Sequence, residues 1–261
     1  MRLVSKKGAF LLAAAGLLLF LCFSCTPKVQ GLVQDPDFTA GAIMDNGLAV
    51  GAVTGPTGPL PQGDASLYGR VLIDRITKER KLFRVKPLEQ VMTAMGPEAY
   101  GKMVAQYAQN GIVSQEFLQD LKSVQGARYL IFARIDADTV DHSNSTSSNE
   151  VVVKRDQNGN PVKTQTEVTN RYTTTRSASV GFDIYDTSTG RSVWSGSLQD
   201  TASTGTDYKD ISDPGKNGWD TLAKDVVRNV VLGPREYPSP PPLQQVLEGI
   251  FKGFAKGLPK S

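Results

Sequence analysis

Histidine and cysteine, two residue types that often serve in acid–base or metal chemistry, are scarce in this sequence. His142 is the single histidine of the 261-residue chain, and it follows two carboxylates, Asp136 and Asp138. Residues two apart in a regular strand lie on the same face, so this pair suggests a cation site with oxygen ligands. The alternative is a strand that runs out into a solvated polar segment. We favour that alternative, because oxygen ligands at this spacing are common on protein surfaces.

Catalysis has equally little support. A nucleophile–base–acid set would have to use His142 alone, and the sequence has no Gly-x-Ser-x-Gly, Walker or dinucleotide-binding motif. We therefore predict no catalytic residue, no metal ligand and no cofactor. Trp194 and Trp219 lie on periodic apolar segments, which favours a role in core packing over one in a binding surface.

The two cysteines, Cys22 and Cys25, form a Cys-x-x-Cys spacing at the end of an apolar run. Such a spacing can mark a redox or metal pair, but that chemistry needs a folded βα context and a tuned thiolate. Here the uncharged run 8–23 follows three basic residues, which is typical of a secretory signal peptide. An uncleaved anchor is the alternative, because about 17–25 residues can span a bilayer.

Cys25 is the residue before which we expect the chain to be cut, and on which we expect it to be acylated. A lipoprotein signal peptidase needs a small residue before the modified cysteine, and Ser24 precedes Cys25 whereas Leu21 precedes Cys22. The segment resembles the lipobox of bacterial lipoproteins, with Cys22 where leucine is usual. Thr26-Pro27 lacks the aspartate that retains lipoproteins in the inner membrane. The resemblance therefore implies acyl anchoring in the outer membrane, facing the periplasm.

Removal of the signal peptide changes the charge of the chain. The full sequence has 29 basic and 26 acidic residues, and residues 1–24 contain three basic residues and no acidic one. The mature chain is left with 29 minus 3, or 26, basic residues against 26 acidic ones. A mature chain without net charge gives no sign of the basic surface that nucleic-acid binding requires, so we predict no nucleic-acid partner.

The composition divides the chain into five segments. We predict a signal peptide at 1–24, a lipidated tether at 25–46, an α/β domain at 47–233, a proline-rich linker at 234–242 and an amphipathic helix at 243–261. The linker is expected to be a stiff, polyproline-like spacer.

The α/β domain is expected to be a sandwich in which helices pack on a mixed sheet of about five strands. Apolar or alternating runs between turn residues predict strands at 47–53, 82–86, 129–135, 178–185 and 191–198. Capping residues and helical periodicity predict helices from Asp64 or Ser66 to about 80, and at 87–95, 98–109, 114–125 and 213–231. The near-continuous apolar character of 129–135 favours a central position in the sheet.

Residues 141–171 differ from the rest of the domain in being rich in Ser, Thr, Asn, Asp and Lys. Asn158-Gly159 is a strong hairpin turn signal, so we predict an extruded polar β-ribbon or loop. A membrane-spanning strand needs apolar residues at alternate positions, and 163–167 has no such face. This composition weighs against a pore.

Three segments in order, 82–87, 126–133 and 182–195, resemble a group of bacterial envelope lipoprotein domains. The group includes the curli-secretion lipoprotein (CsgG type), the penicillin-binding-protein activator lipoproteins and, more distantly, the amino-terminal domain of TolB. The most specific segment is the last, in which an Asp-x-x-x-Gly turn joins two strands. The likeness covers roughly residues 47–232.

Members of this group bind proteins and are not enzymes. The resemblance therefore implies a membrane-anchored, non-enzymatic protein-binding or assembly factor in cell-envelope biogenesis or secretion. An alternative is a subunit of an oligomeric CsgG-like export channel. The polar ribbon of this sequence differs from the members of that type. A second alternative, an envelope hydrolase, would depend on His142.

The carboxyl-terminal segment combines an apolar helical face, a lysine-bearing face and glycine at every fourth position. Each glycine weakens an isolated helix by roughly 1 kcal/mol relative to Ala, so this helix should form on contact. We favour docking on an envelope protein or on a second copy; the alternatives are a membrane interface and folding back on the sheet. The contact residues expected for partner or membrane are Leu243, Leu247, Ile250, Phe251, Phe254, Lys252 and Lys256.

Overall fold

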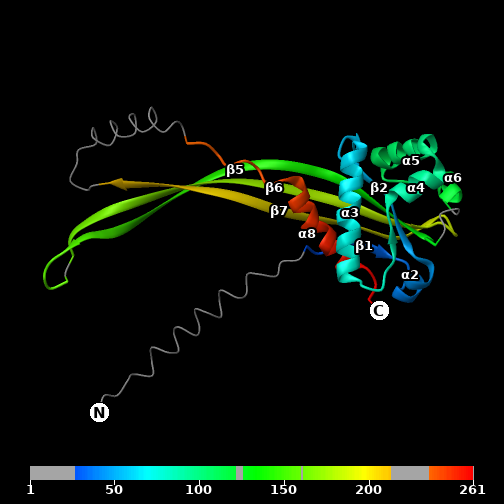
Figure 1. The fold of residues 1–261 in the computed structure, drawn as a ribbon, viewed down its shortest axis with the longest axis horizontal. Coiled ribbons are helices and arrows are strands. Elements are labelled where there is room, and N and C mark those ends of the chain that lie inside the picture. Colours follow the sequence, from blue (N-terminus) through cyan, green and yellow to red (C-terminus); the bar gives the residue numbers. More distant parts are fainter. Residues whose placement is uncertain (1–26, 122–125, 160, 213–234, 261) are drawn as a thin grey trace, which may run out of the picture.

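The computed structural model describes residues 27–121, 126–159, 161–212 and 235–260, which form a seven-stranded mixed sheet covered by helices (Figure 1). Its strand order is β1-β7-β6-β5-β2-β3, and β4 pairs with β2. Only the β2–β4 and β2–β5 pairs are parallel. The strands are β1 (Gln30–Gln34), β2 (Leu48–Gly55), β3 (Gly58–Pro59), β4 (Val85–Lys86), β5 (Tyr129–Arg155), β6 (Pro161–Asp186) and β7 (Arg191–Ser212). The predicted α/β fold with helices on a mixed sheet is confirmed.

Helices cover both faces of the sheet. The described ones are α2 (Ala40–Asn46), α3 (Gln62–Glu79), α4 (Leu88–Met95), α5 (Pro97–Asn110), α6 (Gln115–Asp120) and α8 (Leu243–Gly257). Apolar side chains of α2, α3 and α8 share one core cluster with the first face of the sheet, here called the α3/α8 face. Those of α4, α5 and α6 form a second cluster on the opposite face. The predicted helix at 213–231, which includes Trp219, lies outside the described residues.

Sequence periodicity accounts for these elements. Alternate residues of β6, such as Val180 and Phe182, point into the α3/α8 cluster, as the period of a strand requires. Residues 129–133 of β5 are all buried because this strand lies between β2 and β6. The prediction that this strand is central is confirmed. On α3 the stripe that includes Leu72 and Ile76 faces the sheet, and both side chains are fully buried.

Beyond the body, β5, β6 and β7 continue together as a three-stranded ribbon (Figure 1). The predicted hairpin is present: Gly159 has φ of 85°, and its N–H donates to the Asp156 carbonyl at 3.1 Å. The ribbon strands and the core strands are continuous, since the predicted strand at 178–185 is the end of β6. The 14 residues of β7 after Leu198 also belong to the ribbon, which the sequence did not indicate.

Two predicted boundaries were wrong. Described residues of the expected tether form β1, which pairs with β7, and α2, whose Ile43 is fully buried. The carboxyl-terminal helix is not separate, because α8 packs on β6, β7 and α3 as part of the body. The sheet has seven strands rather than about five because β1 and β3 add to it at its two edges. The sequence gives little signal for either strand, because β1 pairs with the distant β7 and β3 is only two residues long.

Candidate functional site

His142 lies on the α3/α8 face of the ribbon, beneath the proline-rich segment. Its Nδ1 is 3.0 Å from Oγ1 of Thr174, whose hydroxyl donates to the Pro238 carbonyl at 2.7 Å. A hydroxyl has one hydrogen, and Thr174 gives it to Pro238, so we assign Nδ1–H of His142 as the donor to Thr174. The ring also packs on Tyr237, with 4.7 Å between centroids. The only histidine of the chain is therefore engaged in a structural contact.

The two carboxylates near His142 do not converge. A β-bulge between Ile135 and Ala137 interrupts the alternation of β5. Asp136 consequently pairs with Arg134, with 2.7 Å between Oδ1 and Nε, while Asp138 forms two hydrogen bonds of 2.6 and 2.7 Å with Arg176. The expectation that the carboxylates share a face is wrong, because Asp136 lies against the Gly181 side of β6, whereas Asp138 pairs with Ala178 of the α3/α8 cluster. Among the described residues, no group of three or more His, Cys, Asp or Glu side chains could hold a metal ion.

The described part of the proline-rich linker, residues 235–242, lies along the α3/α8 face of the ribbon; we call it the strap. Its carbonyl groups accept hydrogen bonds from ribbon side chains, which are Tyr208 to Glu236 at 3.2 Å, Thr174 to Pro238 at 2.7 Å, Thr204 to Ser239 at 2.7 Å and Arg176 to Pro241 at 3.3 Å. Proline has no backbone N–H, so a proline-rich chain offers mainly acceptors. The hydroxyl, phenol and guanidinium donors of the ribbon complement it.

Aromatic rings hold the beginning of the strap. Tyr237 packs on Tyr172 at 5.1 Å and on His142, and Tyr172 packs edge-on to Tyr208 at 5.4 Å. The guanidinium of Arg235 lies 5.9 Å from the Tyr208 ring centroid, within cation–π range. The predicted stiff spacer is instead a packed segment that joins the ribbon to α8.

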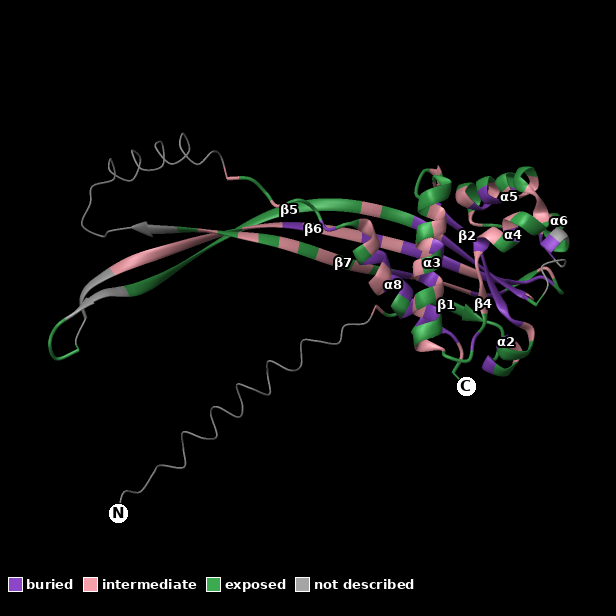
Figure 2. Cartoon of the chain, viewed as in Figure 1, coloured by how far each residue is buried: buried purple, intermediate pink, exposed green. Residues whose placement is uncertain are grey.

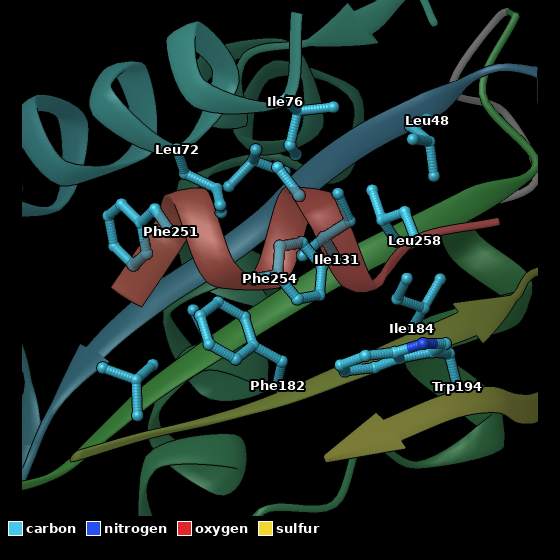
Figure 3. Close-up of a cluster of buried hydrophobic side chains, with 14 of the residues drawn as sticks. Leu48, Leu72, Ile76, Ile131, Phe182, Ile184, Trp194, Phe251, Phe254 and Leu258 are labelled. Atoms are coloured by element: carbon cyan, nitrogen blue, oxygen red, sulfur yellow. The ribbon is translucent and has the colours of Figure 1, made fainter. Parts of the chain in front are cut away.

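The apolar face of α8 is covered by its own domain. Phe254 stacks on Phe182, with 4.2 Å between ring centroids, and meets the edge of Trp194 at 5.1 Å (Figure 3). Leu247, Ile250, Phe251 and Phe254 are fully buried, Leu243 is partly buried, and Lys252 and Lys256 are exposed. Four of the expected contact residues are therefore core residues. This agrees with the alternative in which the helix folds back on its own sheet. The core role predicted for Trp194 is confirmed.

Polar contacts fasten α8 to α3. Arg75 of α3 forms an ion pair with Glu248 of α8. Arg80, just after α3, donates to the carbonyls of Lys256 at 2.6 Å and Leu258 at 2.8 Å. A cation at the last carbonyl groups of a helix satisfies their acceptors and complements the helix dipole.

Gly249, Gly253 and Gly257 form a glycine strip along α8, and the amino-terminal end of the described chain packs against the last two. A Cβ added at Gly253 would lie 2.9 Å from the Pro27 carbonyl oxygen, and one at Gly257 would lie 2.8 Å from Cγ2 of Val29. These glycines therefore serve close approach of the chain that follows Cys25, rather than of another helix. Cys25 itself lies outside the described residues, so its acylation stays a prediction.

The Asp-x-x-x-Gly turn, the most specific segment of the sequence resemblance, has a structural role. The buried Asp186 carboxylate accepts from Arg128 at 2.6 and 2.8 Å, and from the N–H and hydroxyl of Ser188 at 2.8 and 2.7 Å. Burial alone would raise the pKa of Asp186, but these hydrogen bonds outweigh it and hold the pKa at about 2. The turn between β6 and β7 is thereby fixed to the start of β5.

A second buried carboxylate, Asp183, points to the opposite face of the sheet. It accepts from the Tyr107 hydroxyl at 3.0 Å, and burial raises its pKa above the usual range. Burial also raises the pKa of Tyr107. The two groups have no histidine or thiol beside them among the described side chains, so their arrangement indicates packing of α5 on the sheet.

Comparison with known proteins gives fold-level likeness only. No protein-family model matches the chain, and no curated protein matches it either. A subunit of the PelC dodecamer from Paraburkholderia phytofirmans is similar in structure, with 10% identity over 90% of this chain and 99% of that chain, at a TM-score of 0.35.

Two further solved structures are similar in the same sense. The LpoB C-terminal domain from Salmonella enterica has 13% identity, covering 65% of this chain and 87% of that chain, with a TM-score of 0.31. Lipoprotein GNA1162 from Neisseria meningitidis has 14% identity, covering 71% and 96%, with a TM-score of 0.28. At these values the function has to be argued from the chain itself.

Proposed function

We propose that this chain is a lipoprotein of the bacterial outer membrane, anchored by acyl chains on Cys25 and facing the periplasm. In this proposal it acts as a non-enzymatic protein-binding or assembly factor in cell-envelope biogenesis or secretion. The observation that carries the proposal is the ribbon: a long, exposed three-stranded arm projects from a body that begins two residues after Cys25 (Figures 1 and 2).

The polar groups near the base of the ribbon support a non-enzymatic role. His142 is occupied by Thr174 and stacked on Tyr237, and Asp138 is held by Arg176. A general base has to accept the proton of its nucleophile, whereas the Thr174 hydroxyl donates to the Pro238 carbonyl and not to His142. These side chains instead fix the strap and the ribbon to one another.

The ribbon is the part of the molecule best suited to a partner. Beyond Arg134, β5 has no strand on its outer side among the described residues, and β7 has none beyond Ser197. Every described residue of β5 from 141 to 151 is exposed. A free strand edge pairs with an extended segment through main-chain hydrogen bonds, which is a common mode of peptide recognition. The proposed partner is therefore an envelope protein that supplies an extended segment.

The anchor is tested by the Cys25→Ser variant, with Cys22→Ser as the matched control. We expect wild-type protein and Cys22→Ser to yield an acylated amino terminus by mass spectrometry of membrane extracts. Cys25→Ser should yield no acylated chain, and no mature form of it should remain in membranes after a high-salt wash. A Cys25→Ser protein that stays in washed membranes as the mature form contradicts the proposal.

The partner is tested by photo-crosslinking from exposed positions. A crosslinking residue at Ser147 or Asn149, on the edge of the ribbon, should capture one defined envelope protein. The same residue at Glu98 or Lys102, exposed on α5, is the control and should not. Capture from α5 alone would place the binding surface on the body. Deleting residues 234–261 is unsuitable here, because α8 belongs to the core.

A second candidate, a subunit of an oligomeric export channel, is favoured by one observation. The two free edges of the ribbon lie on opposite sides, so copies could add head to tail without using the same edge twice. The mass of the acylated protein in mild detergent decides this candidate: a defined oligomer supports it, and a monomer excludes it. None of the described helices is long and apolar enough to cross a membrane.

A further inference from the structure

The first described residues fix where the lipid anchor meets the body. Pro27 and Val29 are seated against Gly253 and Gly257 of α8. Cys25 is two residues before Pro27, and two extended residues span at most about 7 Å. Acyl chains on Cys25 would therefore hold this side of the body directly at the bilayer, without a long tether between them.

The side of α8 that faces away from the sheet is basic. Lys252 and Lys256 are exposed on it, on the flank between α3 and the seated amino-terminal segment. Lys28 lies between Pro27 and Val29 and is exposed as well. Three lysines are thus presented next to the chain that leads to Cys25.

Charges and apolar side chains around these lysines fit a membrane surface. The nearest carboxylate on α8, Glu248, is neutralised by Arg75 of α3, and Asp200 is partly buried under Gly249 with its Oδ1 accepting from Thr201 N–H at 2.8 Å. On β1, which begins directly after Val29, Leu32 is 48% exposed. Lysines together with an exposed aliphatic side chain are the composition of a surface that lies on anionic lipid headgroups.

We propose that Lys28, Lys252 and Lys256, with Leu32, form a second membrane contact that binds the anionic headgroups of phospholipids. The inference rests on the proposed anchor at Cys25, which brings this surface to the bilayer. It assigns the polar face of α8 to the membrane, while the apolar face is used by the core. The body is then held at two points, which restricts the directions in which the ribbon can project.

The experiment uses the full mature chain with Cys25→Ser, so that no acyl chain contributes. Binding is measured by co-sedimentation with vesicles of phosphatidylethanolamine and phosphatidylglycerol, and with vesicles of phosphatidylcholine alone. We expect salt-sensitive binding to the first kind only. The variant Lys28→Gln/Lys252→Gln/Lys256→Gln should lose affinity on the order of a hundred-fold, at about five-fold for each lysine near an anionic surface.

A variant of equal charge change is the control. Lys86, Lys102 and Lys209 lie on β4, α5 and the ribbon, and changing all three to Gln should leave vesicle binding within about two-fold of the starting protein if only the lysines near the anchor touch the bilayer. Equal losses in both triple variants would mean non-specific attraction and would overturn the inference. Absence of binding to anionic vesicles by the starting protein would overturn it as well.

A label on the acylated protein separates this inference from the anchor itself. The mature chain has no cysteine besides Cys25, so a thiol introduced by Lys252→Cys or by Lys102→Cys can be labelled alone once Cys25 is acylated. In vesicles that carry a headgroup quencher, the fluorophore at 252 should be quenched and that at 102 should not. If mass spectrometry shows acylation but both labels respond alike, the second contact is wrong and the anchor stands. If no acylation is found, the anchor is wrong, and vesicle binding by the lysines is judged by the first experiment.

Discussion

The strands β5, β6 and β7 pass through two different environments, the body and the ribbon. In the body their side chains are buried by helices on both faces, as for Ile131, Phe132 and Phe182 (Figure 2). In the ribbon the same strands carry mostly hydroxyl, amide and charged side chains, and most of these are exposed. The β5–β6 and β6–β7 ladders continue through both. The two regions differ in what surrounds the side chains, which is helices in the body and mostly solvent in the ribbon.

This difference shows that one hydrogen-bonded ladder can serve two purposes. Apolar burial contributes about 25 cal/mol per Å², so the body should dominate the free energy of unfolding. Cross-strand pairs contribute roughly 0.2–1 kcal/mol each, which is enough to keep a ribbon ordered once the body has fixed its base. Substitutions in the strap, which lies between the two regions, should lower the free energy of unfolding by an intermediate amount.

The largest effect is expected from Phe254→Ala in the body. The change removes a ring that stacks on Phe182 and meets Trp194, and large cavities of this kind cost about 3–5 kcal/mol. Denaturant unfolding should show this loss, whereas Lys252→Ala on the exposed side of the same helix should change stability by less than about 0.5 kcal/mol. Similar values for the two variants would mean that α8 is not packed on the sheet in solution.

Asp186→Asn should have the next largest effect, and one that depends on pH. The folded pKa of about 2 lies below the usual value of 3.8, so the unfolded chain binds the proton more readily and stability falls as pH drops from about 4 toward 2. At pH 7 the variant should lose about 1–3 kcal/mol, as for a hydrogen bond to a charged group. The difference from wild type should shrink below pH 4 in urea unfolding. A difference constant from pH 7 to pH 2 would contradict the role of the carboxylate.

Thr174→Val tests the strap at the base of the ribbon. The change removes the hydroxyl that donates to Pro238 and accepts from His142, which should cost about 1 kcal/mol. Hydrogen exchange at described amides of the strap and α8 should become faster. Thr175→Val, on the opposite face, removes only an exposed contact with Ser203 and should leave exchange unchanged. Equal exchange in both variants would show that the strap is held without this hydroxyl.

The smallest effect is expected from Arg171→Gln in the ribbon. Arg171 forms two hydrogen bonds of 2.7 and 3.0 Å with Asp207, but both groups are fully exposed to solvent screening. The unfolding midpoint should not change measurably, although this guanidinium–carboxylate pair has the same geometry as Arg128 with Asp186. A clear loss of stability would show that the ribbon folds as one unit with the body.

Several features could be predicted because they depend on neighbours in the chain. Alternating apolar residues indicated β6, and the Asn158-Gly159 pair indicated the hairpin. The bulge that separates Asp136 from Asp138 could not be predicted, since it depends on the register with β6. For the same reason β1 was taken for a tether: its partner in β7 lies more than 150 residues away.

By itself the sequence determined that the carboxyl-terminal helix has one apolar face and that this face must be covered. It also determined α3 to α6, the central strands and the polar character of the ribbon, because periodicity and turn residues act locally. Only the tertiary structure decided that the cover is the chain's own sheet, that His142 holds the strap and that the glycine strip receives Pro27 and Val29. Amphipathicity specifies a need for burial but not its partner, and the partner is chosen by contacts between residues far apart in the chain.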